Sequence, residues 1–133
     1  MKIDSASMVR RCIETCEDHK AVDLIVYDVR GKSVLTDYCL VLCGASTPHI
    51  RALAEHIQKA FRDLGIAPRS VEGTPASRWV LIDYNDLLIH IFHPELREYY
   101  SPEKLLEEHP VIYPEKSRSP VAEPVGNGVS PTF

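Results

Sequence analysis

The chain of 133 residues lacks any apolar run near the roughly 20 residues that a membrane-spanning helix needs. Its first residues also lack the apolar stretch of a secretory signal peptide, since Asp4 interrupts them. Basic residues are not in excess: 15 Lys and Arg stand against 19 Asp and Glu, a formal net charge of −4. Binding to nucleic acid through its phosphates requires a clustered basic surface. We therefore expect a cytoplasmic protein with no membrane contact and no direct nucleic-acid specificity.

The four cysteines lack the C-x-x-C spacing of a zinc knuckle or a redox pair. Cys12 and Cys16 fall four apart in an expected helix, whereas Cys39 and Cys43 fall four apart in an expected strand, about 13 Å from end to end. We expect all four to be buried, reduced thiols.

Several catalytic motifs are incomplete. Gly31–Ser33 reads GKS after a strand, but a phosphate-binding loop needs a glycine five residues earlier, where Val26 stands. Gly44–Ser46 lies between a strand and a helix, as in the opening motif of nucleotidyltransferases. Those enzymes also need two carboxylates two residues apart on a strand, so that both reach one metal pair. The chain contains no such triplet, and Asp83 is followed two positions later by Asn85.

The histidines also fail to form a metal-binding pattern. His90 and His93 are three apart in an expected strand, which points them to opposite faces. His49 and His56 share a helix face but lie about 10 Å apart along its axis. We therefore expect neither a metal site nor a cofactor.

Helical and strand patterns alternate along the first part of the chain. The periodicities predict helices over about 6–20, 47–64 and 95–108, and strands over about 21–29, 37–46, 69–73, 79–84 and 87–93. Ser5 or Ser7 is expected to cap the first helix, and Ser46 or Thr47 the second. This order predicts an α/β fold in which helices sandwich a mixed β-sheet, with a C-terminal antiparallel hairpin around Asn85.

Five of the ten prolines lie between Pro110 and Pro131, among Ser, Gly and Val. This composition is typical of disorder. We therefore expect one domain over 1–109 and a disordered tail without a site over 110–133.

The predicted hairpin has two unlike faces. A turn centred on Asn85 and Asp86 sets Ile82 opposite Ile89, Val80 opposite Ile91, Leu81 opposite His90, and Trp79 opposite Phe92. The aliphatic face is the expected core. The other combines an indole, an aliphatic residue, a carboxylate and an imidazole, a mixture typical of the centre of a protein–protein interface. Spacing alone leaves open whether Trp79 instead lies beneath a neighbouring helix.

Four segments together resemble one known family: "DLIVYDVRGKSVLTDYCLVLCGAST", "HIRALAEHIQKA", "VEG" and "RWVLIDYNDLLIHIFHPELREYY". In order and spacing they are similar to the ribosomal silencing factor family, also called the Iojap family, over about residues 5–107. The resemblance implies a nucleotidyltransferase-like fold without catalysis. It also implies binding to protein fourteen of the large ribosomal subunit, which sterically blocks association of the two subunits and represses translation under nutrient limitation.

The resemblance also implies a docking surface and an oligomeric state. The matching positions are Trp79, Leu81, Asp83, Tyr84, Asp86 and His90. Many family members have Gly where this chain has Asn85, a residue that also tolerates such a turn. A homodimer is expected off the ribosome. The alternative is a metal-dependent nucleotidyltransferase-like enzyme that would use Asp28, Asp83 and Asp86.

Overall fold

The computed structural model describes residues 3–32 and 36–115. In these residues one six-stranded sheet has the order β3-β4-β5-β2-β1-β6. Its strands are β1 (Val22–Asp28), β2 (Tyr38–Cys43), β3 (Ser70–Thr74), β4 (Trp79–Asp83), β5 (Leu87–Phe92) and β6 (Val111–Tyr113). The helices are α1 (Ser5–Asp18), α2 (Thr47–Asp63), α3 (Pro94–Tyr100) and α4 (Pro102–Leu105), with a 3-10 turn at Pro75–Ser77.

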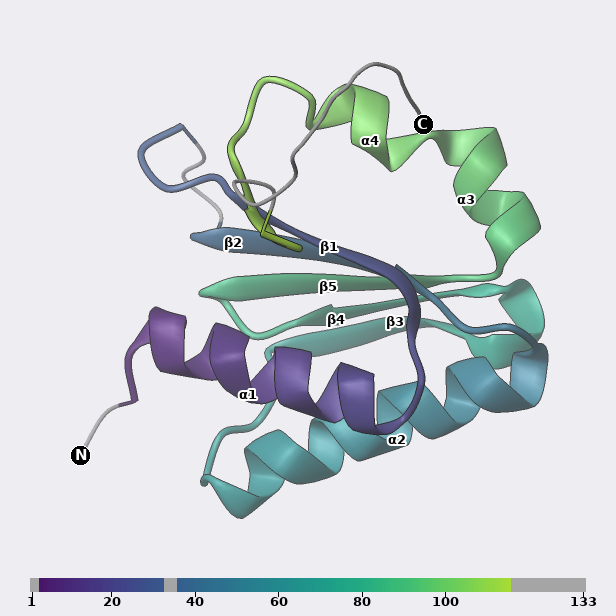
Figure 1. Ribbon diagram of the computed structural model, residues 1–133. Helices are drawn as coiled ribbons and strands as arrows, with labels where there is room; N and C mark the ends of the chain where they lie inside the picture. Colours follow the sequence, from purple (N-terminus) through teal and green to yellow (C-terminus); the bar gives the residue numbers. More distant parts are fainter. Residues whose placement is uncertain (1–2, 33–35, 116–133) are drawn as a thin grey trace.

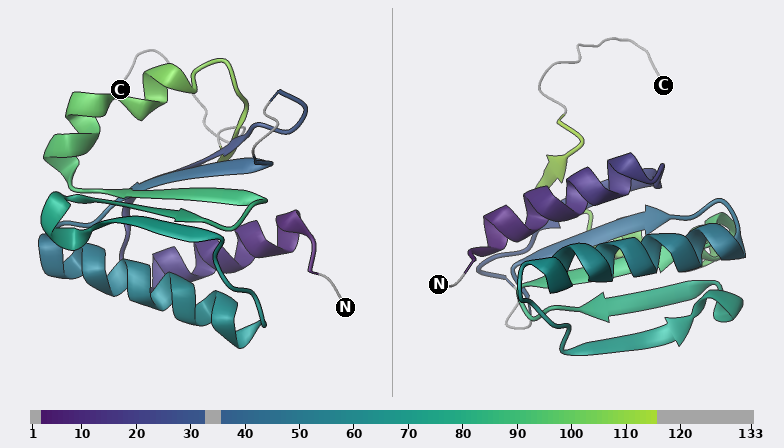
Figure 2. Two further views of the ribbon diagram at one scale, coloured as in Figure 1. Left: turned by 180° about the vertical axis from the view of Figure 1, so that it is seen from behind. Right: turned by 90° about the horizontal axis from the view of Figure 1, so that it is seen from below.

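Helices cover both faces of the sheet (Figure 1). α1 and α2 lie side by side across one face, as the view from below shows (Figure 2), and α3 and α4 lie over the other. β2 and β5 pair in parallel, whereas the other neighbouring strands are antiparallel. The predicted α/β fold, a mixed sheet sandwiched by helices, is therefore confirmed.

The two long helices begin at side-chain caps. Asp4 caps α1, because its carboxylate accepts a hydrogen bond from the Ser7 backbone N–H at 2.8 Å. Ser7 is thus the donor to the cap, and the prediction that a serine caps this helix is wrong. Ser46 caps α2 as predicted, with its hydroxyl accepting from the His49 N–H at 3.3 Å. Gly65, whose φ is +79°, follows the end of α2.

β2 is the most enclosed strand, with all six residues buried. Alternate residues face the two helical layers: Leu40 and Leu42 belong to the core under α1 and α2, and Val41 to the smaller core under α3 and α4. Each fully buried aliphatic side chain stabilises the fold by about 1.5–3 kcal/mol. The apolar stripe of α2 completes the larger core through Ile50, Leu53, Ile57 and Phe61.

All four cysteines are free and buried, as predicted. Cys12 and Cys16 lie in the larger core, and Cys39 and Cys43 in the smaller one. Burial raises the pKa of Cys39 to about 12. This thiol therefore stays protonated at neutral pH, and only a thiolate is a good nucleophile.

The β4–β5 hairpin has the predicted register. Trp79 lies opposite Phe92, Leu81 opposite His90, and Asp83 opposite Leu88. Asn85 occupies the turn with φ +71°, a left-handed conformation that Asn tolerates better than most residues.

The sheet continues beyond the predicted end of the domain at residue 109. β6 (Val111–Tyr113) pairs with β1, so the hairpin is followed by one more strand. A run of three residues within a proline-rich stretch is too short to show the alternating pattern of a strand. Pairing with β1 orders them despite the composition. The rest of the predicted tail, residues 116–133, lies outside the described residues.

Gly73 in β3 is a position where only glycine fits. Its φ is +79°, and a Cβ atom there would lie 2.2 Å from the Trp79 carbonyl oxygen. We expect Gly73→Ala to lower the free energy of unfolding by about 2–4 kcal/mol, through backbone strain and displacement of β3 from β4. Urea denaturation measures this change. Gly65→Ala is the matched control, since Gly65 has the same φ but no atom within 4 Å of the added Cβ. Equal losses in the two variants would contradict the steric account.

Candidate docking surface

One end of the sheet is only partly covered on the side of α3 and α4. On this side, the core beneath the two short helices includes residues of β1, β2 and β5. β4 alternates between buried and half-buried residues, and β5 does so as far as His90. We call the half-buried residues of these two strands the docking face, which consists of Trp79, Leu81, Asp83, Leu88 and His90.

Trp79 lies flat among other aromatic rings. Its ring centroid is 5.4 Å from that of Phe92 at an interplanar angle of 14°, and 5.1 Å from that of Tyr100 in α3. The indole Nε1–H donates to His90 Nδ1 at 3.3 Å. Trp79 is half-buried: the sheet and Tyr100 cover part of the indole and leave the rest accessible. The indole is thus partly accessible, as expected of an interface anchor, and partly covered by α3, as expected of a residue beneath a helix.

His90 supports the indole as a neutral ring. Burial lowers the pKa of His90 to about 4, because a charged imidazolium would lose its hydration here. At neutral pH the ring is therefore uncharged, and its Nδ1 can accept the indole hydrogen. His90 therefore orients the indole of Trp79 and adds no charge to the docking face.

Two carboxylates lie near the turn. Asp83 accepts a hydrogen bond from the Asn85 backbone N–H at 2.8 Å and lies 4.0 Å from Arg69 Nη1. Asp86 is half-buried, and its carbonyl oxygen accepts from the backbone of residue 37 and of Tyr38, both at 3.0 Å. These bonds fix the turn against β2. The Asp83 carboxylate is therefore held within the docking face, and the backbone of Asp86 is fixed beside it.

Tyr84 does not belong to the docking face. Its side chain is 3% exposed and packs against Phe61 of α2, with ring centroids 4.5 Å apart. Burial raises the pKa of Tyr84 to about 12, and its hydroxyl has no hydrogen-bond partner among the described residues. A strand period of two also puts Tyr84 on the same face as the core residues Val80 and Ile82. The expectation that Tyr84 binds a partner is corrected for this reason.

Sequence patterns missed two exposed tyrosines, of which Tyr100 contacts Trp79 and Tyr99 contacts Tyr100. Tyr99 is 79% exposed and Tyr100 is 46% exposed, and their rings meet edge to face at 5.4 Å. Aromatic side chains are enriched at protein–protein interfaces. The sequence Glu98-Tyr99-Tyr100 was the available signal, but the helix predicted over about 95–108 did not indicate toward which side the two tyrosines point.

The acids of the enzymatic alternative are not brought together. Asp28 lies on β1, and β2 and β5 separate that strand from β4, which carries Asp83. Three strand spacings amount to about 14 Å. Arg30 donates two side-chain hydrogen bonds to the Asp28 carboxylate, at 2.9 and 2.7 Å, and these lower the pKa of Asp28. Over residues 3–32 and 36–115, no group of three or more His, Cys, Asp or Glu side chains could hold a metal ion. Nor is any helix in these ranges long and apolar enough to cross a membrane.

A sequence model described as "Ribosomal silencing factor during starvation" matches residues 2–128. The chain belongs to the ribosomal silencing factor family. It is 33% identical over 109 residues to the ribosomal silencing factor of Bacillus subtilis, covering 82% of this chain and 92% of that one. A mouse relative, named mitochondrial assembly of ribosomal large subunit protein 1, is 30% identical over 70% of this chain and 42% of its own length.

Solved structures agree with the family assignment. A Chromobacterium violaceum protein has a TM-score of 0.75 at 30% identity, over 79% of this chain and 88% of its own. A Bacillus halodurans protein has a TM-score of 0.71 at 31% identity, over 80% of this chain and 97% of its own. The predicted membership of the ribosomal silencing factor family is therefore confirmed.

The low pKa of His90 predicts a pH-dependent loss of stability. Because the folded-state pKa is about 4 and the usual value 6.5, the unfolded chain binds the proton more readily between these values. Stability is thus unaffected above pH 6.5 and falls as the pH drops toward 4, by on the order of 2 kcal/mol from this group. Urea denaturation at pH 7, 5.5 and 4.5 should show a smaller fall for His90→Gln than for wild type. Parallel curves would contradict burial of a neutral His90.

Proposed function

We propose that this chain is a cytoplasmic ribosomal silencing factor. It binds the large ribosomal subunit through that subunit's protein fourteen, blocks association with the small subunit, and so represses translation under nutrient limitation. Family membership supports the ribosomal role. The observation that carries the choice of surface is the docking face, with a hydrogen-bonded indole at one end and carboxylates at the other.

The docking face has the physical features of a binding epitope. Aromatic residues that become fully buried on binding supply much of the binding energy at interfaces. Trp79 is already held by His90 and by stacking on Phe92, so little side-chain entropy remains to be lost on binding. Leu81 and Leu88 supply aliphatic surface between the indole and the turn.

The carboxylates indicate a partner with basic groups. Asp83 and Asp86 lie at the turn, Glu72 is opposite Leu81 on β3, and the whole chain carries a net charge of −4. Complementary charges mainly accelerate association and set orientation. A basic ribosomal protein surface fits this arrangement.

The proposed mechanism is steric occlusion, with no bond made or broken. A folded domain bound where the subunits meet prevents their contact. The naming of the mouse relative after assembly of the large ribosomal subunit supports that subunit as the partner. We propose a homodimer when the protein is free. A dimer that buried the docking face would have to dissociate before docking.

Co-sedimentation with purified large subunits tests the docking face. We expect Trp79→Ala and Asp83→Lys each to weaken binding by on the order of 2 kcal/mol, because they remove the aromatic anchor and reverse a charge. Each variant must first show a wild-type circular dichroism spectrum and a cooperative unfolding transition.

Two variants serve as controls. Tyr84→Phe removes only a buried hydroxyl, and Glu55→Lys reverses an exposed charge on α2. Both should bind like wild type. If folded Trp79→Ala and Asp83→Lys still bind and still block subunit joining at wild-type concentrations, this interface is wrong.

A thermal-shift titration tests the enzymatic alternative. We expect Mg²⁺ and nucleoside triphosphates, alone or together, to leave the melting temperature within about 1 °C, since Asp28 is paired with Arg30 and lies far from Asp83. Joint stabilisation by several degrees that Asp28→Asn abolishes would favour the enzyme instead.

A further inference from the structure

A buried arginine anchors α3, the short helix that carries Tyr99 and Tyr100. The seven residues of this helix, Pro94–Tyr100, are too few to be stable alone, so its position depends on contacts with the rest of the domain. Arg97 lies in the middle of the helix, and only 7% of this residue is exposed. Charged residues are rarely buried this deeply unless they are paired. The partners of Arg97 therefore determine how α3 is held.

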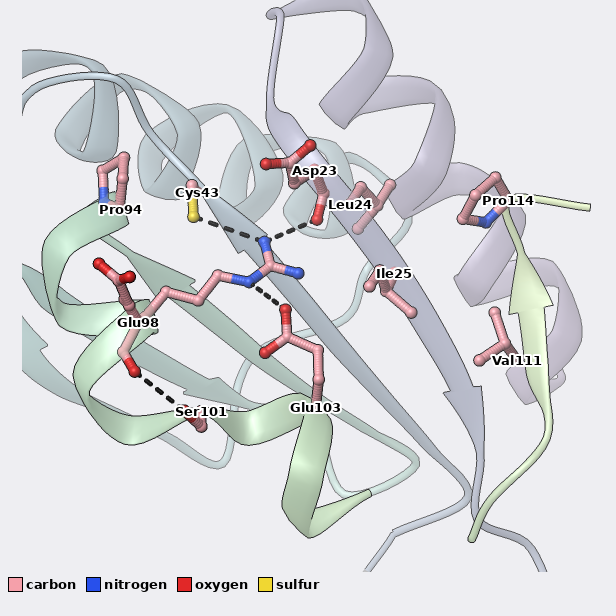
Figure 3. A pocket seen from close by; sticks show the side chains of 11 residues that line it. Asp23, Leu24, Ile25, Cys43, Pro94, Glu98, Ser101, Glu103, Val111 and Pro114 are labelled. Atoms are coloured by element: carbon pink, nitrogen blue, oxygen red, sulfur yellow. Dashed lines mark hydrogen bonds and ion pairs between the residues drawn. The ribbon is translucent and has the colours of Figure 1, made fainter. Parts of the chain in front are cut away.

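The Arg97 guanidinium binds three separate segments, as the dashed lines in Figure 3 show. Its Nε donates to the Glu103 carboxylate of α4 at 2.8 Å, and the two side chains form an ion pair. Its Nη1 donates to the Asp23 carbonyl of β1 at 2.7 Å and to Cys43 Sγ, at the end of β2, at 3.4 Å. One side chain thus joins α3 to α4, to β1 and to β2.

A cavity lies between α3 and β1 around this arginine. It has a volume of 720 Å³, and Arg97, Asp23, Cys43 and Glu103 are among the residues that line it. Side chains that line a cavity have fewer close neighbours than those in a packed core. The hydrogen bonds of Arg97, rather than close packing, therefore join α3 to β1 at this point. Removal of the guanidinium should accordingly loosen α3 while both cores stay intact.

Tyr100 lies almost one turn after Arg97 on the same helix. Residues three apart are neighbours on a helix surface. The Tyr100 ring centroid is 5.1 Å from that of Trp79 and 6.3 Å from that of Phe92. The next residue, Ser101, has a φ of +48° that ends the helix, and its N–H donates to the Arg97 carbonyl at 2.8 Å. Movement of Arg97 would therefore move the ring that covers the indole.

We propose that Arg97 is a positioning residue for the docking face: it holds α3 so that the Tyr100 ring rests against Trp79. This inference rests on the docking face proposed above, and it adds a residue too deeply buried to supply much contact area itself. A surface held in its binding geometry beforehand loses less conformational entropy on association. Arginine suits this role because its planar guanidinium donates several hydrogen bonds in fixed directions.

The fluorescence of Trp79, the single tryptophan of the chain, reports its cover by Tyr100. Arg97→Met keeps an apolar stem but removes every donor. We expect it to unfold cooperatively, to shift the emission to longer wavelength and to raise quenching by acrylamide, because more of the indole would contact water. Arg97→Lys should give intermediate values, since an ammonium can pair with Glu103 but cannot bridge three segments. Arg62→Met, the same change at an exposed position on α2, should alter neither value.

A double-mutant cycle shows whether Arg97 acts through Tyr100. Tyr100→Leu removes the ring directly and should change the fluorescence at least as much as Arg97→Met. Each single variant should bind large ribosomal subunits on the order of fivefold more weakly in co-sedimentation. The double variant should match Tyr100→Leu in both measurements, because the effects of residues that act through one contact are not additive. Additive effects, or unchanged Trp79 fluorescence in folded Arg97→Met, would overturn the proposal.

Glu103→Ala keeps the test decisive if Arg97→Met does not fold. It removes one acceptor of Arg97 at a side chain that is 42% exposed, and it should shift the Trp79 emission in the same direction by a smaller amount. Unchanged emission in this variant and in Arg97→Lys would overturn the proposal. Fluorescence changes in these variants together with wild-type binding of Tyr100→Leu and Trp79→Ala to large subunits would support the positioning of Tyr100 by Arg97 and contradict the docking face.

Discussion

The pairing of β2 with β5 holds both helical layers on one sheet. β2 is buried along its whole length, and its parallel register sets Val41 beside His90 and Cys43 beside Phe92. Phe92 thereby lies in the core beneath α3 and α4, whereas His90 lies where that cover ends. β4 and β3 continue the sheet beyond this point. The docking face exists because one rigid sheet carries two helical layers of unequal extent.

This arrangement holds the proposed docking face rigid in the free protein. Trp79 is stacked, hydrogen-bonded and supported by a strand that is itself held in the core. A neutral His90 makes this possible, since an imidazolium would need hydration that the site does not supply. The same features explain why the surface resembles core strand in sequence. Its residues pack on the sheet with one side of each side chain and leave the other side accessible.

Periodicity predicted most of the fold because the central elements are long and strongly patterned. The α2 stripe and the β4–β5 register follow from spacing alone, and a strand period of two puts Tyr84 on the same face as Val80 and Ile82. β6 was missed because three residues have no measurable period and depend on pairing with β1. Neither the cover of Trp79 by Tyr100 nor the distance from Asp28 to Asp83 could be predicted, because both depend on how separate segments pack.

Hydrogen–deuterium exchange of the chain, free and bound to purified large ribosomal subunits, tests the central claim most directly. The account predicts that binding slows exchange in residues 78–93 and around Tyr99 and Tyr100, where the docking face and its flanking tyrosines lie. Exchange in α1 and α2, on the opposite face of the sheet, should stay unchanged. Protection confined to α1 and α2, with none over 78–93, would show that the protein docks by another surface and would contradict the account.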